Sequence, residues 1–290
     1  MYLQKSTIQL LRFRFSFFLM PVFWFALGSV QEIHILRSMG IFLIIHLILY
    51  PSSNGYNSFM DKDTDSIGGI RQPMQPTKEL YYVTLVMDCV ALLLAVFLSL
   101  SFAGLLLCYI ICSRLYSYRG IRLKKYPVPG YLIVILNQGG IVFLMVYLGA
   151  GDYQPPFSQL PWLGIGAACM LIGGFYPITQ IYQHLQDEKD GVITLSRMLG
   201  IRGTFLFCAV VYLFAFYLLF LYYRQSDHLL YFGILQIFFL PVLVYFLRWF
   251  YNVWKDPAKA DFNHTMEMNW LASTCTNLGF ITLLILSYFD

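Results

Sequence analysis

Long hydrophobic stretches without charge make up most of the chain, and short polar segments separate them. A membrane hydrocarbon core about 30 Å thick requires roughly 20 apolar residues of α-helix to cross it. Nine stretches of about that length lie between clusters of charge, Gly and Pro. They are near residues 13–31, 38–56, 81–99, 101–117, 129–149, 158–181, 203–223, 229–250 and 268–288. The pattern therefore predicts a protein that crosses the bilayer nine times.

The spans are predicted to be helices because they are apolar on every face. Strands of a membrane β-barrel would alternate apolar and polar residues over about ten positions. Residues 81–117 carry no charge between Asp88 and Arg114, so we expect two short spans joined by a tight turn near Leu100. No connection is long enough for a separate soluble domain. The fold class is therefore all-α, with residues 1–290 forming one transmembrane helix bundle.

Composition and charge agree with a membrane protein. Hydrophobic residues make up 59% of the chain and charged residues 12%, against roughly 25% charged in an average soluble domain. Of the 19 Lys and Arg residues, all except Arg37 and Arg224 fall on the side of the N-terminus, which leaves 17 there. The positive-inside rule makes that side cytoplasmic, most simply in a bacterial plasma (inner) membrane. This bias explains the net charge of +4 without a nucleic-acid partner.

The scarce acidic residues gather in two short segments that both face the predicted cytoplasmic side. Six of the 15 acidic residues lie in them: Asp61, Asp63 and Asp65 after the second span, and Asp187, Glu188 and Asp190 after the sixth. Acidic loops of membrane proteins are often simply solvated, which is the alternative interpretation for each segment alone. Their position on one predicted face favours a joint role.

The spacing of the first segment favours a cation site. Asn57, Asp61 and Asp65 recur every fourth residue, so they would form one stripe if the second span continued as a helix. Like charges at that spacing repel by about 0.2–0.5 kcal/mol per pair on an exposed helix, and a bound cation would relieve this repulsion. An EF-hand calcium loop is excluded because Ser66 and Gln72 replace its required Gly and Glu. Oxygen ligands at the mouth of an apolar bundle suit Mg²⁺, whose coordination substrate phosphates can complete.

The second segment offers a similar set of oxygen atoms. Asp187 and Asp190 are three residues apart and are predicted to lie near one helical face. Gln183 lies one turn before Asp187, and Tyr182 is beside it. Gly191 is expected to end the helix.

A cluster of cations on the same side forms the third element of the predicted site. The connection at 113–130 carries five Lys and Arg residues, including Arg119 and Lys124, and Arg71 follows the first acidic segment. These cations could hold and neutralise a diphosphate. The alternative interpretation is an anchor that contacts the phosphates of the surrounding membrane lipid. The two interpretations are compatible.

The two acidic segments resemble the signatures of the UbiA-type intramembrane prenyltransferases. The first signature of that family is NxxxDxxxD after the second span, which Asn57, Asp61 and Asp65 match with Asp63 as an additional aspartate. The second is an Asp-rich segment after the sixth span followed by TL and LG pairs, which DEKDGVITLSRMLG at 187–200 resembles. The number of spans also matches, so the resemblance covers essentially the whole chain.

The second segment departs from the family pattern, which is usually DxxxD. Gln183 stands four residues before Asp187, and Gln186 stands four before Asp190. Either Asp187 and Asp190 form the ligand pair, or an amide oxygen replaces one carboxylate.

The resemblance implies a helix bundle around a central cavity and a Mg²⁺-dependent reaction. A prenyl group would pass from an allylic prenyl diphosphate to an acceptor, commonly an aromatic ring, with release of pyrophosphate. The implied metal ligands are Asn57, Asp61, Asp65, Asp187 and Asp190, the four aspartates being catalytic. The implied substrate-binding residues are Asn57, Arg71, Arg119, Lys124, Tyr182, Gln183 and Asn137. Asn137 is in the middle of the fifth span, where it could face the acceptor.

Two other functions are compatible with parts of the sequence. A family member with impaired catalysis could bind prenyl lipids, and the atypical second segment keeps this alternative open. A secondary transporter would place charges at the bilayer midplane and show an internal repeat, whereas here the charges lie at one face. The acceptor is not identified, since hydroxybenzoate, a naphthoate, homogentisate, a haem or chlorin, and a glycerol phosphate are all used in the family.

Overall fold

A computed structural model describes residues 3–151 and 159–289. Within these ranges nine helical segments are long and apolar enough to cross a membrane, which confirms the all-α class and the number of spans. The first span contains α1 (Lys5–Leu10), the 3₁₀ segment η1 (Phe13–Leu19) and α2 (Met20–Leu27), and the second contains α3 (Ile35–Leu43), the π-helical segment η2 (Ile44–Leu49) and α4 (Tyr50–Asp61). The third and fourth are α5 (Lys78–Leu98) and α6 (Leu100–Ser117), and the fifth contains α7 (Pro127–Val134), the π-helical segment η4 (Ile135–Ile141) and α8 (Val142–Gly149). The sixth contains α9 (Gln159–Phe175), the 3₁₀ segment η5 (Pro177–Gln183) and α10 (His184–Lys189), and the last three are α11 (Leu195–Gln225), α12 (Leu229–Lys255) and α13 (Phe262–Leu286).

The predicted turn between the third and fourth spans is present. Ser99 is extended (φ −165°, ψ 133°) between α5 and α6, and its hydroxyl accepts a hydrogen bond from the Phe102 backbone N–H. This side chain caps the first turn of α6. The sixth span differs from the prediction, because it continues to Lys189 and itself carries Asp187.

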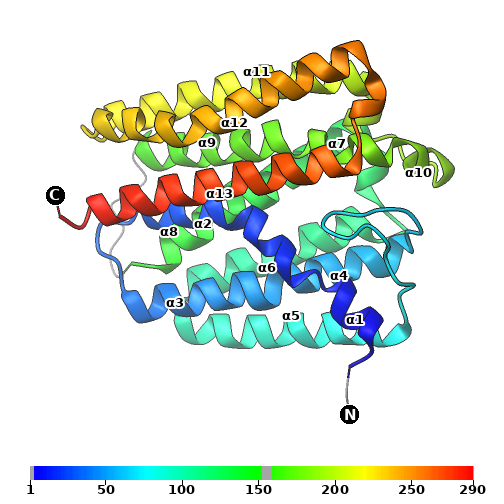
Figure 1. The fold of residues 1–290 in the computed structure, drawn as a ribbon. Helices are drawn as coiled ribbons and strands as arrows, with labels where there is room; N and C mark the ends of the chain where they lie inside the picture. The colour runs from blue at the N-terminus through cyan, green and yellow to red at the C-terminus, as the bar shows by residue number, and fades with distance from the viewer. Residues whose placement is uncertain (1–2, 152–158, 290) are drawn as a thin grey trace.

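Both acidic segments lie at the same end of the bundle (Figure 1). The loop that follows α4 and the short helix α10 are on the right in this view, and the C-terminus is at the opposite end. The shared face predicted from the number of spans is thus confirmed. Two regions far apart in sequence can therefore contribute to one site.

A partly buried ion pair fixes the second, third and fourth spans relative to each other. Arg114 on α6 pairs with Asp88 on α5, and its guanidinium also donates to the Ser52 hydroxyl on α4 (3.0 Å). The guanidinium lies over the Tyr56 ring, 3.9 Å from its centroid. Charged residues inside membrane spans are tolerated when they pair with each other, as Arg114 and Asp88 do here. The network holds the helix that carries the first acidic segment.

The fifth span is interrupted by the π-helical segment η4, which contains Asn137. A π-helical turn shifts the register of the following side chains and is frequent at functional sites. Gly139 in η4 packs so close to the sixth span that an added Cβ would lie 2.7 Å from the Cys169 Cα. The tight contact fixes the orientation of η4.

Candidate functional site

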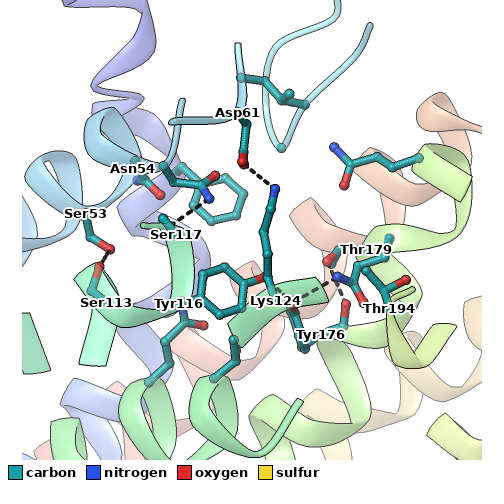
Figure 2. A pocket seen from close by; sticks show the side chains of 18 of the residues that line it. Ser53, Asn54, Asp61, Ser113, Tyr116, Ser117, Lys124, Tyr176, Thr179 and Thr194 are labelled. Carbon is teal, nitrogen blue, oxygen red and sulfur yellow. Dashed lines mark hydrogen bonds and ion pairs between the residues drawn. The ribbon is translucent and has the colours of Figure 1, made fainter. Parts of the chain in front are cut away.

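A cavity opens between the helix ends that carry the two acidic segments (Figure 2). Its wall is formed by residues of η1, α4, α6, α7, η4, the end of α9, η5 and α10, and by residues of the segments that connect the helices. The charged residues that line it are Arg12, Asp61, Asp63, Lys124 and Asp187. The central cavity implied by the family resemblance is therefore present, and both acidic segments contribute to it.

The first segment places Asn57 and Asp61 on the cavity wall, as predicted. The Asp61 side chain is only 3% exposed, and its Oδ2 is 2.5 Å from the Lys124 Nζ. Its Oδ1 is 3.6 Å from the Arg122 Nη2. Asn57 donates from Nδ2 to the Ser117 hydroxyl (3.0 Å), which joins α4 to α6. A buried carboxylate thus lies between two cations at the mouth of the cavity.

The predicted helical stripe is wrong at its third member, Asp65. Helix α4 ends at Asp61 because Lys62 adopts the left-handed conformation (φ 55°) and turns the chain away from the helix axis. Asp65 is exposed and does not line the cavity, whereas Asp63 does. Gln186 of the second segment donates from Nε2 to the Asp63 Oδ1 (2.6 Å). The additional aspartate of the sequence motif therefore faces the site.

The environment of Asp63 changes its protonation. Burial, followed by the nearby charge of Asp61, raises the pKa of Asp63 to about 6. The cations Lys124 and Arg12 act in the opposite direction but do not cancel these effects. Asp63 consequently gains a proton only a little below neutral pH.

The second segment also separates its two aspartates. Asp187 lines the cavity, and its Oδ2 is buried without a hydrogen-bond partner. Asp190 follows the last residue of α10, forms an ion pair with Arg122 and is absent from the cavity wall. The predicted shared face of these two residues is therefore wrong, because α10 ends before Asp190. Of the two, Asp187 is the one that faces the site.

The glutamine and tyrosine predicted in the second segment are both on the cavity wall. Gln183 donates from Nε2 to the Ser66 backbone carbonyl (3.2 Å), a second direct link between the segments. Tyr182 also lines the cavity and packs its ring against Phe262, with centroids 5.2 Å apart. Both residues stay candidates for substrate contact.

The predicted cations divide into one that faces the cavity and two that do not. Lys124 lines the cavity. Arg119 instead donates to the backbone carbonyls of Met60 (2.6 Å) and Asp61 (3.2 Å), so it satisfies the last carbonyls of α4. Arg71 is exposed and outside the cavity wall. Arg119 and Arg71 thus do not line the cavity in this structure, and their contact with phosphate stays a prediction.

Arg12, which was not predicted as a site residue, lines the cavity from the first span. Its backbone is left-handed (φ 49°) between α1 and η1, and its Nη2 donates to the Asn54 carbonyl (3.2 Å). Its buried Nε has no hydrogen-bond partner, and it lies near enough to Asp63 and Asp61 to interact with their charges. The available sequence signal was a charge beside the start of an apolar span, which the positive-inside rule had already explained.

Neutral polar side chains continue the cavity wall below the charged residues. The hydroxyls of Tyr116 and Tyr176 share a hydrogen bond (2.5 Å), and Gln180 donates to Tyr176 (2.9 Å). The hydroxyls of Ser53 and Ser113 are 2.6 Å apart. Figure 2 shows Tyr116 and Tyr176 below the Lys124 amine, with Asp61 above it. Asn137 lines the same cavity, as predicted.

The oxygen atoms at the charged end fit a hard divalent cation. Within the described ranges, no group of three or more His, Cys, Asp or Glu residues is placed to hold a metal unaided. However, three buried oxygens there accept no hydrogen bond: Asp61 Oδ1, Gln186 Oε1 and Asp187 Oδ2. Mg²⁺ is commonly held by one or two carboxylates, with waters and substrate phosphates as its other ligands. The residues present therefore suit Mg²⁺ that arrives with a diphosphate.

Comparison with known proteins identifies the family. Residues 18–272 match the UbiA prenyltransferase family. The fold is similar to that of a UbiA homologue from Archaeoglobus fulgidus bound to GPP and Mg²⁺, with a TM-score of 0.72 and 17% identity over 97% of this chain and 99% of that chain. It is also similar to the apo UbiA homologue from Aeropyrum pernix K1, with a TM-score of 0.71 and 16% identity over 96% and 99% of the two chains.

A third similar structure comes from work on digeranylgeranylglyceryl phosphate synthase, with a TM-score of 0.61 and 17% identity over 97% of both chains. Among curated proteins, none matches the chain. At these identities the structural similarities show a common fold, and the match to residues 18–272 covers most of the 290 residues. The protein therefore belongs to the UbiA prenyltransferase family, a family of enzymes that transfer prenyl groups.

Proposed function

We propose that the protein is an active Mg²⁺-dependent enzyme that transfers a prenyl group from an allylic prenyl diphosphate to an acceptor. Both acidic segments would bind the diphosphate of the donor. The observation that carries this proposal is the direct contact between the segments. Gln186 donates to Asp63 (2.6 Å), and Gln183 donates to the Ser66 carbonyl (3.2 Å). Because these contacts bring Asp61, Asp63 and Asp187 to one cavity, a single metal–diphosphate unit could bind all three.

The donor's diphosphate would lie at the charged end of the cavity. Bound Mg²⁺ would neutralise part of its charge, with Asp61, Asp63 and Asp187 as carboxylate ligands and Asn57 beside them. Lys124 and Arg12 would donate hydrogen bonds to phosphate oxygens, since both reach this end. Arg122 would act indirectly, because it contacts Asp61 and Asp190 and is outside the cavity wall.

The chemical step would break the bond between the allylic carbon and the diphosphate oxygen. The bonding electrons leave with pyrophosphate, and the allylic carbocation forms a new bond with a nucleophilic atom of the acceptor. The acceptor then loses a proton to pyrophosphate. The rings of Phe175 and Tyr176 line the cavity and could stabilise the carbocation while excluding water.

Related structures support the choice of donor. The Archaeoglobus fulgidus homologue was observed with GPP and Mg²⁺ and also with DMAPP and Mg²⁺. These ligands support an allylic diphosphate as the donor of this protein, and its apolar tail would lie toward the bilayer. The acidic segments would face the cytoplasm, as the distribution of Lys and Arg indicates.

The test is release of pyrophosphate from geranyl diphosphate by the purified protein, with and without Mg²⁺ and in the presence of candidate acceptors. We expect Mg²⁺-dependent release that disappears in Asp61→Asn and persists in Asp65→Asn. Binding of geranyl diphosphate without release under every condition would instead identify a prenyl-lipid-binding protein. That alternative rests on the second segment, where Gln183 or Gln186 stands at a position that the family usually fills with an aspartate.

A further inference from the structure

The inner part of the cavity is polar but carries no charge among the described residues that line it. Its polar side chains are those of Ser53, Tyr109, Ser113, Asn137, Gln138 and Gln180. Ser53 precedes Asp61 by eight residues of α4, which is about 12 Å along a helix. The inner part is therefore about two helical turns from the first acidic segment. It is the part of the cavity wall that the diphosphate site leaves available for the acceptor.

Asn137 has an unused hydrogen-bond acceptor in this inner part. Its Nδ2 donates to the Tyr109 backbone carbonyl (3.2 Å), so its Oδ1 is the atom left for another partner. Asn137 is only 5% exposed, and its Oδ1 is buried and accepts no hydrogen bond. Buried polar atoms in folded proteins are nearly always paired. A ligand that donates a hydrogen bond to this oxygen would satisfy it.

The position of Asn137 is fixed by the packing of the helix that carries it. Asn137 is in the π-helical segment η4, two residues before Gly139. The backbone at Gly139 packs against the Cys169 backbone without room for a side chain. The amide is therefore held in place before a ligand arrives, which favours selective recognition.

Charge decides which chemical class of acceptor fits. The cations among the described residues of the cavity wall are Arg12 and Lys124. Lys124 is paired with Asp61, and Arg12 lies in the field of Asp63 and Asp61. Arg12 is the cation nearest the inner part, since its Nη2 donates to the carbonyl of Asn54, the residue after Ser53 (3.2 Å). Because Arg12 already lies in the field of two carboxylates, a carboxylate or phosphate buried in the inner part would lack a counter-ion of its own, which is unfavourable. At the outer end it would compete with the diphosphate for the same two cations.

We infer that the acceptor enters uncharged and is held by a hydroxyl or N–H group that donates to Asn137 Oδ1. This inference rests on the proposed prenyl transfer, whose second substrate it describes. It favours a neutral phenol, hydroquinone or alcohol over acceptors that carry a carboxylate or phosphate. Asn137 is then a residue that determines specificity for the acceptor, while the acidic segments bind the donor.

The experiment compares matched neutral and anionic compounds on the full-length protein in lipid nanodiscs. Binding of methyl 4-hydroxybenzoate and of 4-hydroxybenzoate, and of 1,4-dihydroxynaphthalene and its 2-carboxylate, is measured by calorimetry at pH 7.5. We expect the neutral member of at least one pair to bind ten times more tightly than its acid. If neither neutral compound is preferred, including the case in which none binds, the inference is wrong.

A variant pair tests the role of Asn137. We expect Asn137→Leu to weaken binding of the preferred neutral compound at least tenfold and to leave Mg²⁺-dependent binding of geranyl diphosphate unchanged. Asn269→Leu is the matched control, since Asn269 is fully buried on α13, has both amide atoms unpaired and does not line the cavity. Equal weakening by both variants would contradict the inference. Failure of the prenyltransferase proposal is distinguishable, because the wild type would then release no pyrophosphate from geranyl diphosphate under any condition.

Discussion

The two acidic segments reach the same cavity through different local structures. The first is the end of a regular helix, α4, and the left-handed Lys62 turns the chain immediately after Asp61. The second follows a 3₁₀ segment and a short helix, and Asp190 lies beyond the last residue of α10. In each segment the last aspartate along the chain, Asp65 or Asp190, does not line the cavity. Motif spacing therefore identifies the segment, but the position of the helix end decides which carboxylates reach the site.

The segments also differ in how their carboxylates are neutralised. Asp61 lies against Lys124 (2.5 Å) and near Arg122 (3.6 Å), whereas none of the ion pairs among the described residues involves Asp187. Arg122 links the two segments because it also pairs with Asp190. The first segment thus supplies a carboxylate already balanced by cations, and the second supplies one that is available for a new partner.

The largest effect is expected from the first segment. Asp61→Asn should lower the rate of pyrophosphate release by about 10³-fold, because it removes a charge at the centre of the diphosphate site. Asp65→Asn should stay close to the wild type, since Asp65 is exposed. The measurement is a steady-state assay with geranyl diphosphate and saturating Mg²⁺. Equal losses in the two variants would mean that the helix continues past Asp61 in the working enzyme.

In the second segment, too, one aspartate should matter more for the rate than the other, but the losses should be smaller. Asp187→Asn should lower the rate by about 10²-fold. Asp190→Asn should lower it by only about tenfold, because Asp190 positions Arg122 and does not line the cavity. The same assay, with circular dichroism as a check on folding, measures both. A greater loss in Asp190→Asn than in Asp187→Asn would reverse the assignment.

The raised pKa of Asp63 predicts a pH dependence. At pH values below about 6, a proton on Asp63 competes with Mg²⁺, so the Mg²⁺ concentration needed for half-maximal activity should rise there. Asp63→Asn should weaken Mg²⁺ binding and make its residual affinity less dependent on pH between 5.5 and 7.5. An identical pH profile in the variant would show that another group is responsible.

The same pKa has a consequence for stability without metal. The folded-state pKa is about 6, against a reference value of 3.8, so the folded protein binds this proton more tightly than the unfolded chain. The contribution of Asp63 to stability is therefore fully present below pH 3.8 and is lost as the pH rises through about 6. In Asp63→Asn this part of the pH dependence should be absent.

The smallest effects are expected at the exposed cations. Arg119→Ala should destabilise the end of α4 by about 0.3–1 kcal/mol, because its guanidinium is half exposed while it binds the Met60 and Asp61 carbonyls. Arg71→Ala should leave both stability and activity unchanged. Thermal unfolding in detergent, followed by the activity assay, would measure these differences. A large loss of activity in Arg71→Ala would place that residue at the diphosphate after all.

The spans and the shared face of the acidic segments were predictable because they depend on properties that act over many residues. Membrane thickness sets span length, and the number of crossings sets the side on which each loop emerges. Asn57, Asp61, Asp187 and Lys124 could be chosen because they lie close to a span end. These four lie on the cavity wall.

The remaining positions depend on local conformations that the sequence does not display. The left-handed backbone at Lys62 and Arg12 is unusual for residues with side chains, and nothing in their types predicts it. The choice between Asp63 and Asp65 follows from the first of these turns. Arg12 itself has the second left-handed conformation, and its side chain lines the cavity.

The central claim is that the two acidic segments bind one metal–diphosphate unit. A double-mutant cycle on Mg²⁺-dependent binding of geranyl diphosphate, with Asp61→Asn, Asp187→Asn and the double variant, tests it most directly. We predict strongly non-additive effects, the double variant binding about as weakly as the weaker single variant, because each carboxylate needs the same ligand. Additive losses would show two independent sites and would contradict the account.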